Sequence, residues 1–196
     1  MLKLPRHVLL PVISITIAAI TLLIGALLIF QRGAEQGTSA IGGEFSLIAQ
    51  DGRTVTERDL AGGPSIVFFG FTHCPDICPT ALFDIGQIYS ALGPNRDRLK
   101  TFFITVDPER DTQELLNTYL SSFDPNIVGL TGSVDAVAQT MKAYRAFARK
   151  VPMENGNYTM DHTSHGYLMD RKGRFVSSLN FDQPPEELAK KISTYF

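Results

Sequence analysis

The 196-residue sequence has no tryptophan, only two cysteines and no large excess of charge of either sign, with 18 Lys and Arg against 20 Asp and Glu. This near balance excludes a strong electrostatic attraction to nucleic acid or to an acidic membrane surface, so we expect no nucleic-acid partner. Internal repeats and low-complexity segments are also lacking. Apolar residues make up 44% of the chain, which permits a buried core and excludes a disordered or collagen-like chain.

Apolar residues are concentrated near the start of the chain. Residues 8–30 form a run of 23 residues without a charge, which as a helix is about 34 Å long and spans a bilayer. A secretory signal peptide has a shorter apolar core, of about 7 to 15 residues. The run therefore predicts an uncleaved transmembrane anchor. Cleavage near Thr38 and Ala40 is the less favoured alternative, because this pair lies eight or more positions beyond the run.

The charges beside the apolar run predict its orientation. Lys3, Arg6 and the terminal amine precede it, whereas Arg32 is the only basic residue close behind it. Because positive charges favour the cytoplasmic side, we expect the N-terminus inside and the folded part outside the cytoplasm. Only seven residues precede the run, too few for a mitochondrial presequence. The sequence thus predicts a bacterial inner-membrane protein with its C-terminal domain in the periplasm, where thiols can be oxidised.

The rest of the chain predicts a linker followed by one domain. Residues 31–43 are rich in Gly, Ser, Thr, Ala and Gln, a composition typical of a flexible tether. Residues 44–196 have the size of a single domain. Within it, the continuous apolar runs Ser65–Phe71 and Thr101–Val106 indicate strands buried on both faces. The segment Pro79–Leu92 between them has helical apolar spacing, so the three predict a β-α-β unit.

Local signals predict the other elements. Asp111 followed three residues later by Glu114 resembles a capping box and predicts the start of a helix. Ser133 predicts another helix, which extends through Phe147 to a basic last turn at Arg149 and Lys150. We also expect a hairpin around Asp51-Gly52, a short strand at Asn126–Leu130, a loop over Val151–Asn157, a hairpin around Arg171–Gly173 and a closing helix from Pro185 to Ile192. This order predicts an α/β fold in which helices flank a central mixed sheet of four or five strands.

The two cysteines are the main candidates for chemistry. Cys74 and Cys78 lie where a buried strand ends and a helix begins, the edge at which α/β proteins usually place their sites. A helix N-terminus stabilises a thiolate and lowers its pKa. The spacing of four residues puts both sulfurs on one face, which permits either chelation of a soft metal ion or a disulfide. The alternative is a purely structural pair, although a disulfide that closes so short a loop stabilises a chain little.

A metal site needs at least one further ligand, and we consider the four histidines: His7, His73, His162 and His165. His7 borders the apolar run and is excluded; His73 is expected to point to solvent, and no feature supports His165. His162 follows Asp161, a carboxylate that could orient the imidazole, and is therefore the predicted third ligand. Two thiolates and one imidazole form a soft set that favours copper and also suits zinc.

Three segments resemble motifs of a known family, in the same order. They are Gly70–Pro79 (GFTHCPDICP), Thr105–Thr112 (TVDPERDT) and Asp161–Thr163 (DHT). These segments are similar to the SCO/SenC family of membrane-anchored copper-delivery proteins for cytochrome c oxidase. The resemblance extends from about Phe45 to Phe196, and the predicted anchor before it is also typical of that family.

The resemblance implies a thioredoxin-like fold with Cys74, Cys78 and His162 as ligands of a copper ion. The implied partners are the oxidase subunit that carries the binuclear copper centre and an upstream protein that donates copper. The family motif from Asp107 to Asp111 suggests no chemistry beyond a turn and a helix cap. Three methionines, Met153, Met160 and Met169, are expected to fill the core rather than to bind copper.

Two functions fit these residues best. A copper metallochaperone, which is not an enzyme, binds the ion through Cys74, Cys78 and His162 and passes it on by ligand exchange. A thiol-disulfide oxidoreductase uses the same cysteines to reduce the cysteines of the oxidase copper site. A general thioredoxin role is less favoured, because three residues rather than two separate the cysteines. A peroxiredoxin is disfavoured because its Thr-x-x-Cys pattern is absent at Cys74.

Overall fold

The computed structural model describes residues 17, 19–25, 41–154 and 156–196. The chain divides into two units, Met1–Thr38 and Ser39–Phe196. The described residues of the first unit are helical. Within the described part of the chain, no helix combines the length and the apolar character needed to cross a membrane. Most of the predicted anchor 8–30 and of the predicted linker 31–43 lies outside the described residues, and both stay predictions.

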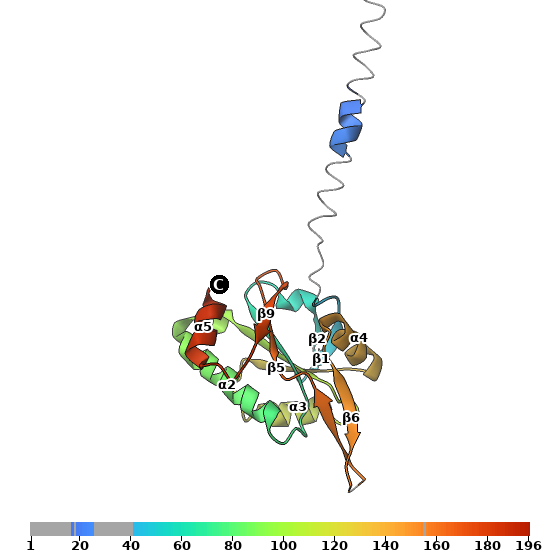
Figure 1. Ribbon diagram of the computed structural model, residues 1–196, viewed down its shortest axis with the longest axis vertical. Helices are drawn as coiled ribbons and strands as arrows, with labels where there is room; N and C mark the ends of the chain where they lie inside the picture. Colours follow the sequence, from blue (N-terminus) through green and yellow to red (C-terminus); the bar gives the residue numbers. More distant parts are fainter. Residues whose placement is uncertain (1–16, 18, 26–40, 155) are drawn as a thin grey trace, which may run out of the picture. The chain divides into compact units, whose positions relative to one another are not determined.

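The second unit is built around a mixed sheet (Figure 1). Its seven strands have the order β2-β1-β5-β4-β3-β8-β9. Its central strands β3 (Ser65–Gly70), β4 (Lys100–Thr105) and β5 (Ile127–Thr131) are parallel to one another. The outer strands are β1 (Ser46–Ala49), β2 (Thr54–Thr56), β8 (Gly166–Met169) and β9 (Phe175–Leu179), and they pair antiparallel. The predicted α/β class and central mixed sheet are confirmed. The predicted strand number was too low, because both hairpins join this sheet, through β1–β5 and β3–β8 pairing.

Helices cover both faces of the central strands. They are α2 (Ile77–Leu92), α3 (Gln113–Leu120), α4 (Val134–Tyr144) and α5 (Pro185–Ser193), with short 3-10 turns η1 (Glu57–Leu60) and η2 (Gly93–Arg98). On one face, Phe103 of β4 lies 6.1 Å from the ring of Tyr119 in α3. On the other face, Phe69 of β3 lies 5.5 Å from the ring of Tyr144 in α4. This two-sided burial explains why β3 and β4 are continuous apolar runs.

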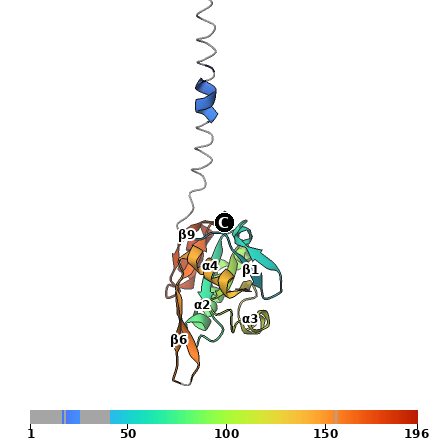
Figure 2. The same ribbon diagram turned by 90° about the vertical axis from the view of Figure 1, so that its right-hand side faces the viewer.

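The prediction for residues 134–157 was partly wrong. Helix α4 ends at Tyr144, and Arg145 adopts a left-handed conformation with a φ of 53°, which terminates the helix before Phe147. Strand β6 (Ala148–Pro152) contains the two basic residues that were expected to end the helix, and β7 (Tyr158–His162) pairs with it. The expected loop over Val151–Asn157 is thus shorter than predicted, because Val151 and Pro152 belong to β6. The two strands form a separate two-stranded sheet, which extends beyond the main sheet in Figures 1 and 2.

Candidate metal centre

The two cysteines lie at the start of α2. This helix begins at Ile77, two residues earlier than predicted, so that Cys78 is in its first turn and Cys74 is in the loop before it. The backbone N–H of Cys78 donates a hydrogen bond to Sγ of Cys74 at 3.3 Å. Cys78 is fully buried, whereas Cys74 is partly exposed, and both are free thiols. The local fold thus holds one sulfur inside the protein and the other at its surface.

Gly70, the last residue of β3, makes room for the buried sulfur. A Cβ atom at this position would lie 2.9 Å from Sγ of Cys78 and 2.6 Å from the ring of Phe103. Both distances are shorter than real side-chain contacts allow, and the nearby core is closely packed. A glycine is therefore required here for Cys78 to occupy its position.

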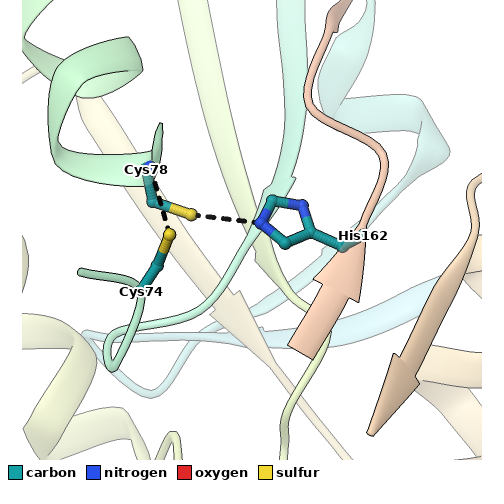
Figure 3. Close-up of side chains that lie close together, drawn as sticks. All are labelled: Cys74, Cys78 and His162. Carbon is teal, nitrogen blue, oxygen red and sulfur yellow. Dashed lines mark hydrogen bonds between the residues drawn. The ribbon is translucent and has the colours of Figure 1, made fainter. Parts of the chain in front are cut away.

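His162 is the last residue of β7 and points at the cysteine pair (Figure 3). The sulfurs of Cys74 and Cys78 and a ring nitrogen of His162 all lie within 4.8 Å of one another. Nε2 of the imidazole lies 3.5 Å from Sγ of Cys78. The structure therefore brings together the three residues that the sequence predicted as metal ligands, although 84 positions separate Cys78 from His162.

Hydrogen bonding fixes the form of the imidazole. Nδ1 of His162 lies 2.8 Å from the carbonyl oxygen of Thr163. Because a carbonyl oxygen only accepts, Nδ1 carries the proton, and the lone pair of Nε2 is directed at the sulfurs. The expectation that Asp161 orients the ring was wrong. The Asp161 carboxylate is exposed and pairs with Arg149 at 3.2 Å, so the backbone does the orienting instead.

The surroundings of the two thiols shift their pKa values in opposite directions. The pKa of Cys74 is lowered to about 4, chiefly because the Cys78 side chain donates a hydrogen bond to its sulfur and further because the backbone N–H of Cys78 does so. The pKa of Cys78 is raised by that same hydrogen bond to Cys74, by burial and by the neighbouring negative charge. At neutral pH the pair therefore holds one thiolate, on the exposed side, and one thiol, on the buried side.

The other histidines lie apart from this group. His73 is half exposed, and its Nδ1 lies 3.0 Å from Oγ1 of Thr72, as expected for a ring that faces solvent. His165 packs against the ring of Tyr167 at 4.8 Å, and burial lowers its pKa. His7 lies outside the described residues. Among the methionines, Met169 is buried in the core as predicted and Met160 packs against it, whereas Met153 is 48% exposed, so the expectation for Met153 was wrong.

The acidic motif after β4 has a structural role that the sequence reasoning missed. Asp111 is fully buried and accepts hydrogen bonds from the backbone N–H of Thr72 at 3.0 Å, from its hydroxyl at 2.6 Å and from the hydroxyl of Thr105 at 2.6 Å. It was not the helix cap that we predicted: Thr112 caps α3 by accepting from the N–H of Leu115. Asp111 instead fixes the loop that leads into the first cysteine.

The fold and this group define a class of protein. A mixed sheet with helices on both faces, which presents two sulfurs and an imidazole at the start of its first β-α-β helix, is a thioredoxin-like scaffold with a soft-metal donor set. The SCO1/SenC family model matches residues 33–196. The chain therefore belongs to the SCO1/SenC family, as its motifs predicted.

Individual relatives agree with this assignment. A solved structure of ScoI from Bradyrhizobium japonicum with copper bound is 50% identical and covers 80% of this chain and 99% of its own, with a TM-score of 0.77. Yeast Sco1 with copper bound is 39% identical and covers 79% of this chain and 87% of its own, with a TM-score of 0.73. The mitochondrial SCO1 homolog 1 of Arabidopsis thaliana is 38% identical over 84% of this chain. The match spans 51% of that relative's length.

Proposed function

We propose that this protein binds copper through Cys74, Cys78 and His162 and delivers it to the binuclear copper centre of cytochrome c oxidase during assembly. The observation that carries the proposal is the convergence of two sulfurs and the free lone pair of one imidazole within 4.8 Å. Thiolate and imidazole are ligands that copper prefers, and a three-coordinate set suits both of its oxidation states. The two copper-bound relatives, at 50% and 39% identity, support the choice of copper over zinc.

Delivery requires that one side of the site be open to a partner. Cys74 is partly exposed, and the neighbouring Ile77 is 52% exposed, so a partner can approach the sulfur that is already a thiolate. We propose ligand exchange at this side, first with an upstream copper donor protein and then with the copper-carrying subunit of the oxidase. In this role the protein transfers an ion and turns over no substrate bond.

We further propose that residues 8–30 anchor the protein in a bacterial inner membrane, with the C-terminal domain in the periplasm. The uncharged run and the positive residues before it support this orientation. Reporter fusions test it: phosphatase fused after Phe196 should be active, and a reporter that requires the cytoplasm should be inactive. The opposite pattern would overturn the proposed location.

The copper site is tested by substitution of its three residues in the full chain. Cys74→Ser and Cys78→Ser should each abolish stoichiometric binding of Cu(I), because one thiolate and an imidazole hold it far more weakly than two thiolates do. His162→Ala should weaken Cu(II) more than Cu(I), because two sulfurs hold Cu(I) in near-linear geometry while Cu(II) needs the nitrogen. Competition titrations with chelators of each ion measure both effects. Tight binding that survives both serine substitutions would refute the site.

A second candidate function is reduction of the cysteines of the oxidase copper site. It is favoured by one observation, the free thiols of Cys74 and Cys78, of which the exposed one has its pKa lowered to about 4. A single variant separates the two functions. His162→Ala should keep most of the disulfide-reducing activity of the cysteines but lose oxidase maturation if copper delivery is the function. Maturation that persists in this variant would favour thiol reduction.

A further inference from the structure

His162 belongs to a small two-stranded sheet that is separate from the main sheet. The β6–β7 hairpin pairs with itself, from Ala148 opposite His162 to Pro152 opposite Tyr158. In the described part of the chain it forms no ladder with the seven-stranded sheet, and it extends beyond that sheet in both views (Figures 1 and 2). The distance from the imidazole to the sulfurs therefore depends on the side chains that hold the hairpin against the body.

Three side chains make the more protected connection, beside an exposed ion pair between Lys150 of β6 and Glu109. Arg110, in the loop after β4, donates from Nε to the Asp107 carboxylate and from Nη1 to the backbone carbonyl of Tyr158 at 3.0 Å. Its guanidinium also lies 3.8 Å from the centre of the Tyr158 ring. The Tyr158 hydroxyl closes the set by donating to the other Asp107 oxygen at 2.9 Å. We call Asp107, Arg110 and Tyr158 the latch.

The charged pair of the latch, Asp107 and Arg110, is largely protected from solvent. Asp107 is 1% exposed and the Arg110 side chain is 18% exposed, so its charged hydrogen bonds are screened less than those of a surface pair. The ion pair between Arg149 and Asp161 offers a contrast: it joins the two strands of the hairpin to each other, and its side chains are 66% and 54% exposed. That pair does not connect the hairpin to the body.

The latch also reaches toward the residue that contacts the imidazole. The Arg110 guanidinium lies 5.9 Å from the centre of the Phe71 ring. Phe71 in turn meets the His162 ring edge-to-face, with centroids 5.6 Å apart. Phe71 follows β3 and precedes Cys74 by three residues, so the same guanidinium packs near the cysteine-bearing loop while it binds the hairpin.

We propose that the latch positions His162 against the two sulfurs and that Arg110 is its positioning residue. The inference rests on the proposed copper function and adds to it a specificity for oxidation state. With the latch broken, the hairpin is free to move away, while Cys74 and Cys78 keep their places at the start of α2. The site then loses its nitrogen but keeps both sulfurs. The latch therefore supports Cu(II) binding and leaves Cu(I) binding to the cysteines.

Copper affinity of the full chain tests this role. Arg110→Gln should weaken Cu(II) by about 10- to 100-fold, as is usual when a partner outside the ligand set is removed, and should change the Cu(I) affinity by less than about threefold. Arg110→Lys keeps the charge but cannot make both donations and the stacking contact, so it should rescue Cu(II) affinity only in part. The matched control is Arg149→Gln, which removes a hairpin arginine and should leave both affinities unchanged. An equal Cu(II) affinity in Arg110→Gln and wild type would overturn the latch.

A measurement on the metal-free chain separates the latch from the copper proposal. In wild type, ring protons of His162 and Phe71 should show a nuclear Overhauser contact and a ring-current shift. Arg110→Gln should lose both signals, and Arg149→Gln should keep them. If both signals persist in Arg110→Gln, the latch is refuted, whether or not the chain binds copper. A wild-type chain that binds no copper refutes the proposed function alone.

A gentler variant covers the case in which Arg110→Gln does not fold. Tyr158→Phe removes only the hydroxyl that donates to Asp107 and keeps the ring under the guanidinium. It should weaken Cu(II) several-fold, reduce the His162–Phe71 contact and leave Cu(I) unchanged. A folded Tyr158→Phe protein with wild-type Cu(II) affinity and ring contact would overturn the latch as well.

Discussion

Removal of the buried carboxylate of Asp111 should destabilise the protein and disturb the cysteine loop. Its two oxygens accept from the N–H and hydroxyl of Thr72 and from the hydroxyl of Thr105. In Asp111→Ala these donors lose their acceptor in a place that water does not reach. An unsatisfied buried donor costs about 1–3 kcal/mol, and the hydroxyls can rotate to recover part of the loss. We therefore expect the free energy of unfolding to fall by about 3 kcal/mol.

The substitution Asp111→Asn provides a graded comparison. The amide keeps one acceptor oxygen but turns an NH₂ group toward a donor, so about half of the effect, or roughly 1–2 kcal/mol, should remain. Asp97→Ala is the control, because this aspartate is exposed in η2, and surface changes usually cost less than about 0.5 kcal/mol. The order of stability should be wild type and Asp97→Ala, then Asp111→Asn, then Asp111→Ala.

Equilibrium urea unfolding of the reduced, metal-free chain measures these differences. The chain has no tryptophan, so far-UV circular dichroism is the suitable signal. The midpoints should shift while the urea dependence stays constant, since the substitution changes little of the surface that unfolding exposes. If Asp111→Ala lies within about 1 kcal/mol of Asp97→Ala, the buried carboxylate does not hold the loop as we argue.

Two further predictions concern the cysteine pair. Because the pKa of Cys74 is lowered to about 4, its alkylation rate in the metal-free chain should change less than about twofold between pH 5.5 and 7.5, whereas an ordinary thiol accelerates about tenfold per pH unit. Mass spectrometry of the alkylated chain measures this rate. A tenfold rise per pH unit at Cys74 would contradict the lowered pKa. Gly70→Ala should cost about 1–3 kcal/mol and weaken copper binding, because the new Cβ meets Phe103 and Cys78. The control, Gly86→Ala within α2, should instead raise the free energy of unfolding by about 0.5–1 kcal/mol. A Gly70→Ala protein that is more stable than wild type would refute the expected clash.

The centre of the fold was predictable because burial leaves a direct mark on sequence. Strands β3 and β4 are covered by helices on both faces, so each is a continuous apolar run. Helix α2 between them has one buried face, which includes Leu82, Ile85 and Tyr89. The hairpins were predicted from a different signal, the turn residues Asp51-Gly52 and Arg171–Gly173. It did not show that both hairpins join one sheet, because strand pairing is a tertiary property.

The β6–β7 hairpin was not predicted, and its composition explains why. It lies at the surface with mostly polar or partly exposed side chains, so its strands lack the alternation of buried and exposed residues that marks a strand. Arg149 and Lys150 also fit the end of a helix, and only the left-handed conformation of Arg145 stops α4 before them. Such a local conformation leaves no pattern in the surrounding sequence.

The candidate site divides in the same way into a local and a tertiary part. The cysteine pair follows from spacing alone, because four residues at a helix start put two sulfurs together. His162 lies 84 residues beyond Cys78, and the chemistry of its neighbours suggested it for a wrong reason, since the Thr163 carbonyl rather than Asp161 orients the ring. The role of Asp111 was missed because a carboxylate near a helix start also fits a cap.

This division has a chemical consequence for a protein that handles copper. The sulfurs share one short, well-packed segment, where Gly70 and Asp111 fix their positions. The nitrogen comes from a small separate sheet, which Arg110 joins to the body. Two sulfurs satisfy Cu(I), whereas Cu(II) needs further donors. On the latch proposal, a break at Arg110 therefore removes the nitrogen from the site and leaves both sulfurs in place.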